Sequence, residues 1–161
     1  MDVLQYALDM ELEGERYYHS QAVKYAQTPL KTVFDVLAED EKKHAELLRG
    51  EMNKTPSALA AREPLPNRKN VFQGLADYKP PVEELPDQAA LYQTALQMED
   101  KSIRLYTDLR AAAKEPQTQA LFDLLIREET RHYQILEDVF RFVNRPNEWV
   151  ESAEFGLREE Y

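Results

Sequence analysis

The sequence reads Phe34-Asp-Val-Leu-Ala-Glu-Asp-Glu-Lys-Lys-His-Ala-Glu-Leu-Leu48 in its first half and Phe122-Asp-Leu-Leu-Ile-Arg-Glu-Glu-Thr-Arg-His-Tyr-Gln-Ile-Leu136 in its second. The two stretches align at an offset of 88 residues and share six of fifteen residues. Each contains a glutamate three residues before a histidine, and residues at this spacing differ by about 60° around a helix axis, so they share one face. Two of the three histidines of the chain lie in this repeated frame.

The same offset relates the segments that precede these stretches. Ala7-Leu-Asp-Met-Glu-Leu-Glu-Gly-Glu-Arg-Tyr-Tyr18 aligns with Ala95-Leu-Gln-Met-Glu-Asp-Lys-Ser-Ile-Arg-Leu-Tyr106, and six of the twelve positions are identical. Because one offset serves both pairs of segments, the chain predicts two helical hairpins of equal build. Their simplest assembly is an all-α four-helix bundle with pseudo-twofold symmetry.

Apolar periodicity and turn residues predict where the four helices begin and end. The expected helices are 3–26, 29–52, 88–113 and 116–144. Thr28 is the expected N-cap of the second helix, with Pro29 at its first position, and Asp87 is the expected N-cap of the third. We predict one bundle domain over 1–146, followed by a short docked tail over 147–161 that packs Trp149 and Phe155.

A connector over 53–86 separates the two hairpins. Six prolines in this segment rule out a long helix there. A helix of about 25 residues is roughly 37 Å long, and an extended chain spans about 3.3 Å per residue. The connector is therefore long enough to cross the whole bundle, and we expect up-down-down-up order with one long crossover.

The composition of the chain excludes several classes of function. The net charge is −10, whereas nucleic acids and anionic membrane surfaces require basic patches. This acidity serves solubility or gathers carboxylates around cations. There is no cysteine, which excludes disulfides, thiolate zinc sites, iron–sulfur clusters and cysteine nucleophiles within these residues. Neither a signal-peptide pattern nor a membrane-spanning apolar run is visible, so a cytoplasmic location is expected.

The repeat predicts a buried metal site with six ligands. Each half offers a lone glutamate from its first helix and a Glu-x-x-His pair from its second, and the six residues are Glu11, Glu41, His44, Glu99, Glu129 and His132. Four carboxylates balance the charge of two divalent cations, and this ligand set is that of di-iron and di-manganese bundles. Oxygen-rich donors with two imidazoles suit iron or manganese, although zinc could also bind. No catalytic residues beyond the ligands are expected.

Two tyrosines follow the lone glutamates on the same helix faces. Tyr18 and Tyr106 lie seven residues after Glu11 and Glu99, almost directly along the helix. They are either core aromatics or phenols that hydrogen-bond the ligand carboxylates.

Four further polar residues near the predicted ligands are assigned minor roles. His19 has no counterpart in the repeat and is expected not to bind metal, and Glu15 is at most an auxiliary ligand. Asp40 and Glu128 are turned by 100° from the ligand glutamates and are expected to face solvent.

With these motifs assigned, the chain resembles the rubrerythrin branch of the ferritin-like superfamily over nearly its whole length. The tail over 148–155 is also similar to that of short relatives of rubrerythrin. The resemblance implies a ferritin-like fold and a non-haem centre of two iron ions that reduces hydrogen peroxide or dioxygen in oxidative-stress defence. It also implies a homodimer.

The chain departs from the rubrerythrin pattern in two respects. Rubrerythrins carry a four-cysteine iron site that delivers electrons, so this chain would need an external electron-donor protein. They also place a further glutamate three residues after the third-helix ligand, where this chain has Ser102, paired in the repeat with Gly14. Small residues at both positions either leave an open pocket beside the metals or let the first and third helices pack closely. Close packing is the favoured interpretation.

Three functions remain open at this point. The first is the peroxide- or dioxygen-reducing oxidoreductase. The second is a ferroxidase or iron-binding protein in iron storage or metal homeostasis. The third is a metal-stabilised scaffold whose acidic surface meets a partner protein.

Overall fold

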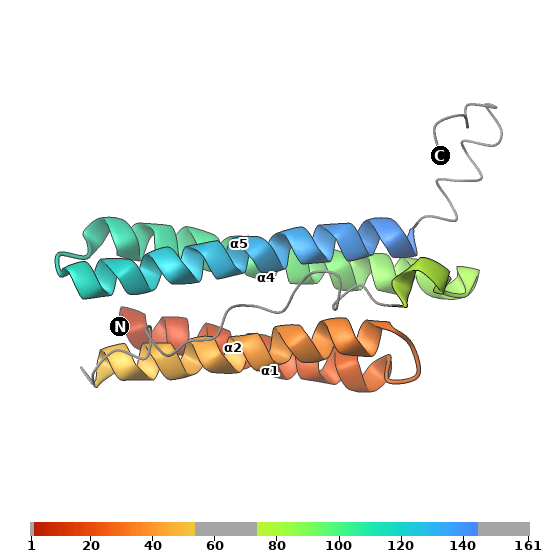
Figure 1. Cartoon of the computed structure of the whole chain (residues 1–161), viewed down its shortest axis with the longest axis horizontal. Coiled ribbons are helices and arrows are strands. Elements are labelled where there is room, and N and C mark those ends of the chain that lie inside the picture. Colours follow the sequence, from red (N-terminus) through yellow and green to blue (C-terminus); the bar gives the residue numbers. More distant parts are fainter. Residues whose placement is uncertain (1, 54–73, 145–161) are drawn as a thin grey trace, which may run out of the picture.

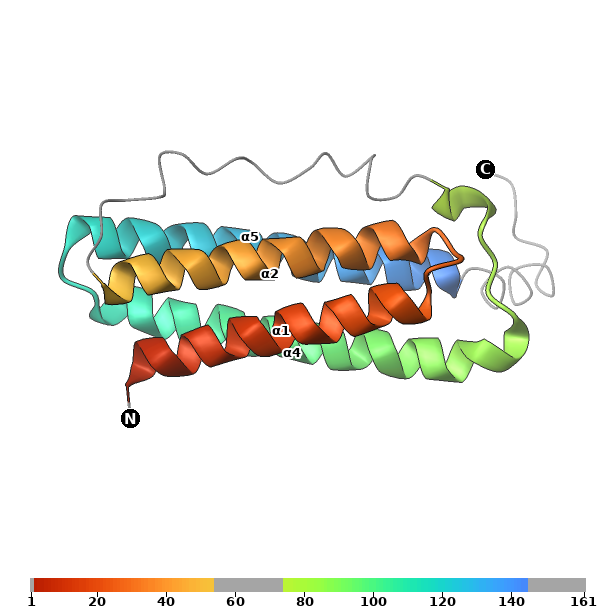
Figure 2. The ribbon, with the colours of Figure 1, turned by 90° about the horizontal axis from the view of Figure 1, so that it is seen from below.

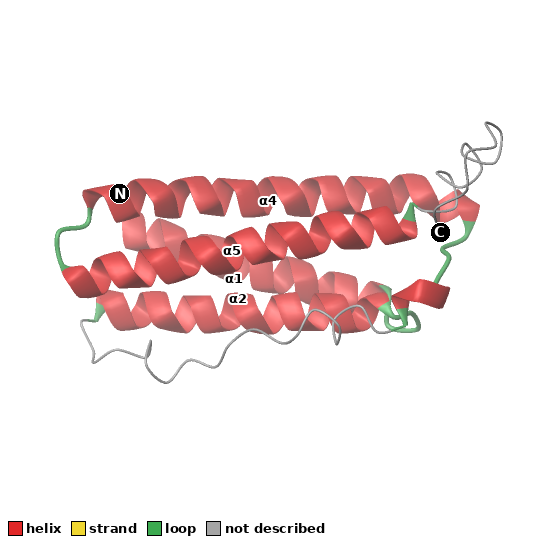
Figure 3. Cartoon of the chain, turned by 45° about the horizontal axis from the view of Figure 1, so that its top comes forward, coloured by secondary structure: helices red, strands yellow, loops and turns green. Residues whose placement is uncertain are grey.

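The computed structural model describes residues 2–53 and 74–144, which form a four-helix bundle (Figure 1). Its elements are α1 (Val3–Lys24), α2 (Leu30–Met52), η1 (Leu75–Asp77), η2 (Val82–Glu84), α4 (Leu85–Ala112) and α5 (Pro116–Val143), where η denotes a 3₁₀-helix. All regular structure in these residues is helical (Figure 3). Within the described residues, no helix is both long and apolar enough to span a membrane.

The two halves form the predicted antiparallel hairpins. Helix α1 packs mainly on α2, and α4 packs mainly on α5. In Figure 2, α2 ends at one end of the bundle and α4 begins at the other, so α4 runs in the same direction as α2. The predicted up-down-down-up order is therefore confirmed.

The helix boundaries lie close to the predicted ones, with the largest difference at the start of α4. The Oγ1 atom of Thr28 accepts a hydrogen bond from the Leu30 amide (3.1 Å), but α2 begins at Leu30 with Pro29 as its N-cap, one residue later than predicted. Asp87 was predicted as the cap of α4, but the helix begins at Leu85 and Pro86 lies in its first turn. A proline is tolerated there because the first amides of a helix have no intrahelical acceptor.

Part of the predicted crossover packs on the bundle. The side chain of Leu75 is buried in the core, where η1 packs on α5, and the preceding Gly74 lies close to Pro29. Gly74 has a φ of +87°, in the left-handed region that favours glycine. Residues 54–73 and the predicted docked tail over 147–161 lie outside the described residues.

Two apolar clusters occupy the two halves of the bundle. One includes Tyr18, Phe34, Tyr92 and Leu136, and the other includes Leu48, Tyr106 and Phe122. Between them along every helix lies a layer of buried charged residues. The hydrophobic core thus flanks the polar centre on both sides.

Candidate metal centre

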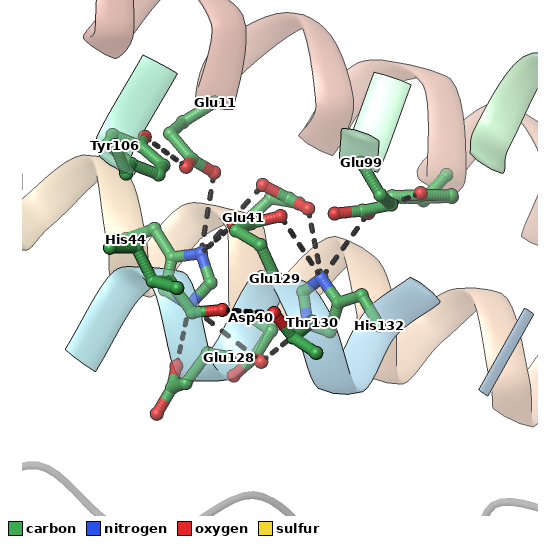
Figure 4. A network of polar contacts seen from close by, with 12 residues as sticks. Glu11, Asp40, Glu41, His44, Glu99, Tyr106, Glu128, Glu129, Thr130 and His132 are labelled. Atoms are coloured by element: carbon green, nitrogen blue, oxygen red, sulfur yellow. Dashed lines mark hydrogen bonds and ion pairs between the residues drawn. The ribbon is translucent and has the colours of Figure 1, made fainter. Parts of the chain in front are cut away.

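The structure brings the six predicted ligands together in the middle of the bundle. All four helices contribute, and no member of the set is more than 4% exposed: Glu11, Glu41, His44, Glu99, Glu129 and His132. Figure 4 shows their carboxylates and imidazoles pointing toward one another. The prediction that these six residues are buried and face one another is therefore correct.

The six residues form two overlapping groups of four that could each hold one metal ion. The first group contains Glu11 and His44, the second contains Glu99 and His132, and both include Glu41 and Glu129. In each group the potential ligand atoms lie within 4.8 Å of one another. Two neighbouring cations could be held here, with Glu41 and Glu129 within reach of both and Glu11 and Glu99 as the terminal carboxylates of one group each.

Distances to the histidine nitrogens support this division. The Nδ1 atom of His44 lies 2.7 Å from Glu129 Oε1 and 3.4 Å from Glu11 Oε2. The Nδ1 atom of His132 lies 3.2 Å from Glu41 Oε1 and 3.3 Å from Glu99 Oε1. Both Nδ1 atoms therefore face the centre of the cluster.

The Nε2 atoms of the two histidines contact two carboxylates that were wrongly predicted to face solvent. Asp40 and Glu128 were expected to face solvent, but they are only 4% and 7% exposed. His132 Nε2 lies 2.7 Å from Asp40 Oδ2, and His44 Nε2 lies 2.6 Å from Glu128 Oε1. Each imidazole is thus held by a carboxylate of the facing helix, the arrangement that orients metal-binding histidines.

The sequence does contain a signal for these two residues. Asp40 and Glu128 are themselves related by the 88-residue offset, and each lies four residues before a predicted ligand histidine. Residues four apart share a helix face. The prediction failed because it judged both positions against the neighbouring glutamates and not against the histidines.

The two tyrosines hydrogen-bond the terminal carboxylates of the opposite hairpin. The Tyr18 phenol donates to Glu99 Oε1 at 2.6 Å, and the Tyr106 phenol donates to Glu11 Oε1 at 2.5 Å. Burial, together with the charge of the contacted carboxylate, raises the pKa of both phenols well above the ordinary value. Both tyrosines therefore stay protonated and act as donors.

A pocket of about 220 Å³ lies between α1 and α4 beside the cluster. Gly14 and Ser102 both line it, and so do Glu41 and Glu99. The favoured expectation of close packing between these helices is therefore wrong. A Cβ atom on Gly14 would lie 3.3 Å from Glu41 Cδ, so this glycine leaves room for a site carboxylate of α2.

The remaining polar residues singled out near the site lie outside both groups. Glu15 is partly exposed and His19 is exposed, and neither belongs to a metal-binding group among the described residues. The expectation for His19 agrees with its position.

Without metal, the buried cluster retains protons. Burial and the charge of Glu129 outweigh the effect of His132 and raise the pKa of Glu99 to about 8. Burial and the charges of Glu11 and Glu129 also raise the pKa of Glu41 well above its usual range. Burial alone would lower the histidine pKa values, but the surrounding carboxylates raise both well above the ordinary value.

The atoms that face the centre of the cluster are suited to bind cations. Six buried atoms of the site make no hydrogen bond of normal geometry within the described residues: Glu11 Oε2, His44 Nδ1, Glu99 Oε2, both Glu129 carboxylate oxygens and His132 Nδ1. Such groups are costly to bury unless something compensates them. All six are of the donor types that iron and manganese accept.

Comparison with known families agrees with this geometry. The rubrerythrin family model matches residues 2–140. The chain belongs to the rubrerythrin family. Rubrerythrins are di-iron proteins of the ferritin-like superfamily, so the resemblance inferred from the paired motifs is confirmed. No match was found among curated proteins or among solved structures.

Proposed function

We propose that this rubrerythrin-family protein is a non-haem di-iron oxidoreductase that reduces hydrogen peroxide, or dioxygen, with electrons from an external donor protein. The observation that carries the proposal is the pair of four-residue groups that share Glu41 and Glu129. Iron held in them would supply one-electron steps between its ferrous and ferric states.

The protein residues in this proposal bind and orient. Glu11 and Glu99 would each hold one of the two ions, and Glu41 and Glu129 belong to both groups and could contribute to either ion. His44 and His132 would each bind an ion through the Nδ1 atom. The direction of both Nδ1 atoms, toward the cluster carboxylates, supports this role.

The surrounding residues keep this ligand set in place and leave one side accessible. Asp40 and Glu128 hold the outer nitrogens of the two imidazoles, and Tyr18 donates to the terminal carboxylate of the second group. The pocket between α1 and α4 supplies a route by which a small oxidant reaches Glu41 and Glu99.

Stopped-flow mixing of the anaerobic ferrous protein with hydrogen peroxide tests the proposal. We expect two irons per chain and oxidation at least tenfold faster than that of free Fe(II). Sustained turnover with a chemical reductant distinguishes a peroxidase from a ferroxidase that only stores or transfers iron. Oxidation no faster than that of free Fe(II) would disprove the proposal.

A matched pair of variants on α1 assigns the effect to the site. Glu11→Gln removes a carboxylate of the first group, and we expect it to lower iron occupancy and the oxidation rate. Glu15→Gln changes a partly exposed carboxylate one turn away, outside both groups, and we expect less than a twofold effect.

The homodimer, which the resemblance implies, and the cytoplasmic location, which the sequence patterns led us to expect, stay predictions. Sedimentation of the purified chain tests the dimer, because a monomer and a dimer of an 18.8 kDa chain are readily separated.

A further inference from the structure

The pocket between α1 and α4 is larger than hydrogen peroxide requires. Its volume is about 220 Å³. A water molecule takes up roughly 30 Å³ in the liquid, and a protein cavity of about 150 Å³ is sufficient to bind benzene. The pocket therefore has room for a ligand with a carbon skeleton as well as two oxygen atoms.

The walls of the pocket offer apolar contact above a polar floor. Met10 and Met98 contribute to the walls from facing helices, and the repeat offset relates them to each other. Tyr17 adds an aromatic ring, and its hydroxyl donates to the Leu91 carbonyl at 3.3 Å. Methionine thioethers are polarisable and adapt to ligands of irregular shape, and they pack favourably against aromatic rings.

The floor of the pocket belongs to the candidate metal centre. Glu41 and Glu99 line it, and both are at least 96% buried. The Oε2 atom of Glu99 makes no hydrogen bond of normal geometry within the described residues.

Ser102 leaves space where a longer side chain would fill the pocket. The residue is only 9% exposed and lines the cavity one helical turn after Glu99. The other two charged residues of the lining, Glu13 and Lys101, are exposed, and the Lys101 ammonium group lies over the Tyr6 ring. A ligand that fits these surroundings has one small polar end directed inward and an apolar remainder.

We propose that the pocket binds an organic hydroperoxide, with its O–O–H group toward Glu41 and Glu99 and its carbon skeleton against Met10 and Met98. This inference rests on the proposed function and extends its substrate class. The hydroperoxide ROOH accepts two electrons, which the external donor provides, and two protons. The O–O bond breaks, and the products are the alcohol ROH and water.

Methionine NMR tests binding without relying on turnover. The chain has four methionines, Met1, Met10, Met52 and Met98. With ¹³C-methyl labelling, the signals of Met10 and Met98, which line the pocket, can be compared with that of Met52, which does not. The full chain loaded with zinc, which does not change redox state, is titrated with 2-phenyl-2-propanol, the alcohol product of cumene hydroperoxide. We expect saturable ring-current shifts of the Met10 and Met98 methyl signals, with Met52 unchanged.

Turnover of two peroxides tests the reaction. We expect the iron-loaded wild-type protein to reduce cumene hydroperoxide with a kcat/KM within tenfold of that for hydrogen peroxide. Ser102→Leu narrows the pocket, and we expect it to lower the cumene-to-hydrogen-peroxide ratio of kcat/KM at least tenfold. The matched control Thr94→Leu changes an exposed hydroxyl residue of the same helix outside the pocket, and we expect it to alter that ratio less than twofold.

The outcomes separate this inference from the proposed function. Reduction of hydrogen peroxide without reduction of cumene hydroperoxide, and without shifts at Met10 and Met98, overturns the inference and leaves the proposed function standing. Failure to reduce either peroxide overturns both. Shifts confined to Met52, or equal losses in Ser102→Leu and Thr94→Leu, contradict the assignment to this pocket.

Discussion

The two nitrogen atoms of each site histidine have different neighbours, and this difference determines what the residue can do. The Nδ1 atoms of His44 and His132 face the shared carboxylates, whereas the Nε2 atoms contact Glu128 and Asp40 from the facing helix. A carboxylate on Nε2 favours a proton there and leaves the Nδ1 lone pair free for a cation. Asp40 and Glu128 are therefore positioning residues.

Replacing Asp40 by asparagine should weaken metal binding while the fold is kept. We expect Asp40→Asn to reduce the apparent metal affinity about 10–100-fold, the usual effect of losing such a carboxylate. Competition with a chelator of known affinity measures the change, and circular dichroism monitors helix content. The neighbouring Glu39 is exposed, so Glu39→Gln is the matched control and should leave the affinity within twofold. Equal affinity in both variants would contradict the positioning role.

At the scale of a single helix, α1 contains a glycine where helix propensity alone favours another residue. Glycine in a helix interior is less stable than alanine by about 1 kcal/mol. Gly14 nevertheless lies in the middle of α1, directly against the Glu41 side chain. The glycine makes α1 locally less stable than alanine would, and it leaves space for the Glu41 carboxylate of α2.

The variant Gly14→Ala should shift stability and metal binding in opposite directions. An added Cβ would lie 3.3 Å from Glu41 Cδ and 3.4 Å from Glu41 Oε2, which requires that side chain to move by a few tenths of an ångström. We expect the metal-free protein to gain up to about 1 kcal/mol in urea unfolding, because the carboxylate can shift when no cation holds it. Metal affinity should fall, as measured by the same chelator competition. A rise in both quantities would show that Gly14 does not make room for Glu41.

At the scale of the whole molecule, the bundle encloses charges that it cannot neutralise by internal hydrogen bonds alone. The metal-free cluster compensates by holding protons, since the pKa of Glu99 is raised to about 8 and those of Glu41, His44 and His132 lie well above their ordinary values. Two divalent cations would displace these protons. Metal affinity and global stability are therefore linked to pH through the same residues.

The metal-free protein should become less stable as the pH rises from about 5 to 9. Glu99 has an ordinary pKa of 4.5 and a folded-state pKa of about 8, so between these values the folded chain holds a proton that the unfolded chain releases. The raised histidine pKa values act in the same direction above their ordinary value of 6.5. Stability falls wherever the unfolded state binds fewer protons, and we expect a decrease in Tm on the order of 10 °C.

Differential scanning calorimetry across this pH range measures the effect, with the metal-loaded protein as the control. Because cations replace the protons, the loaded protein should show a higher Tm and a smaller change with pH. Metal binding should also release protons, which calorimetric titrations in buffers of different ionisation enthalpy detect. A metal-free Tm that rises over this range would contradict the proton-filled cluster.

The sequence alone determined the helices, their pairing and the six residues of the candidate centre. It could do so because the 88-residue repeat places a glutamate and a Glu-x-x-His pair at equivalent positions in both hairpins. Helical geometry then places the glutamate and the histidine of each pair on the same face of their helix. The length of the crossover likewise determined the order of the helices, because only a long segment lets α4 begin at the far end of the bundle. The predicted start of α4 was three residues too late. Pro86 was interpreted as the end of the connector, but a proline is also tolerated in the first turn of a helix, where it lies here.

Only the tertiary structure decided which residues meet across the hairpins. Tyr18 contacts Glu99 and not Glu11, Asp40 contacts His132, and Gly14 makes room for Glu41. These pairings depend on the rotation and spacing of neighbouring helices, which side-chain packing sets and which periodicity along one helix does not contain. Helix spacing also explains why Gly14 and Ser102, which were expected to pack closely against each other, line a pocket between α1 and α4.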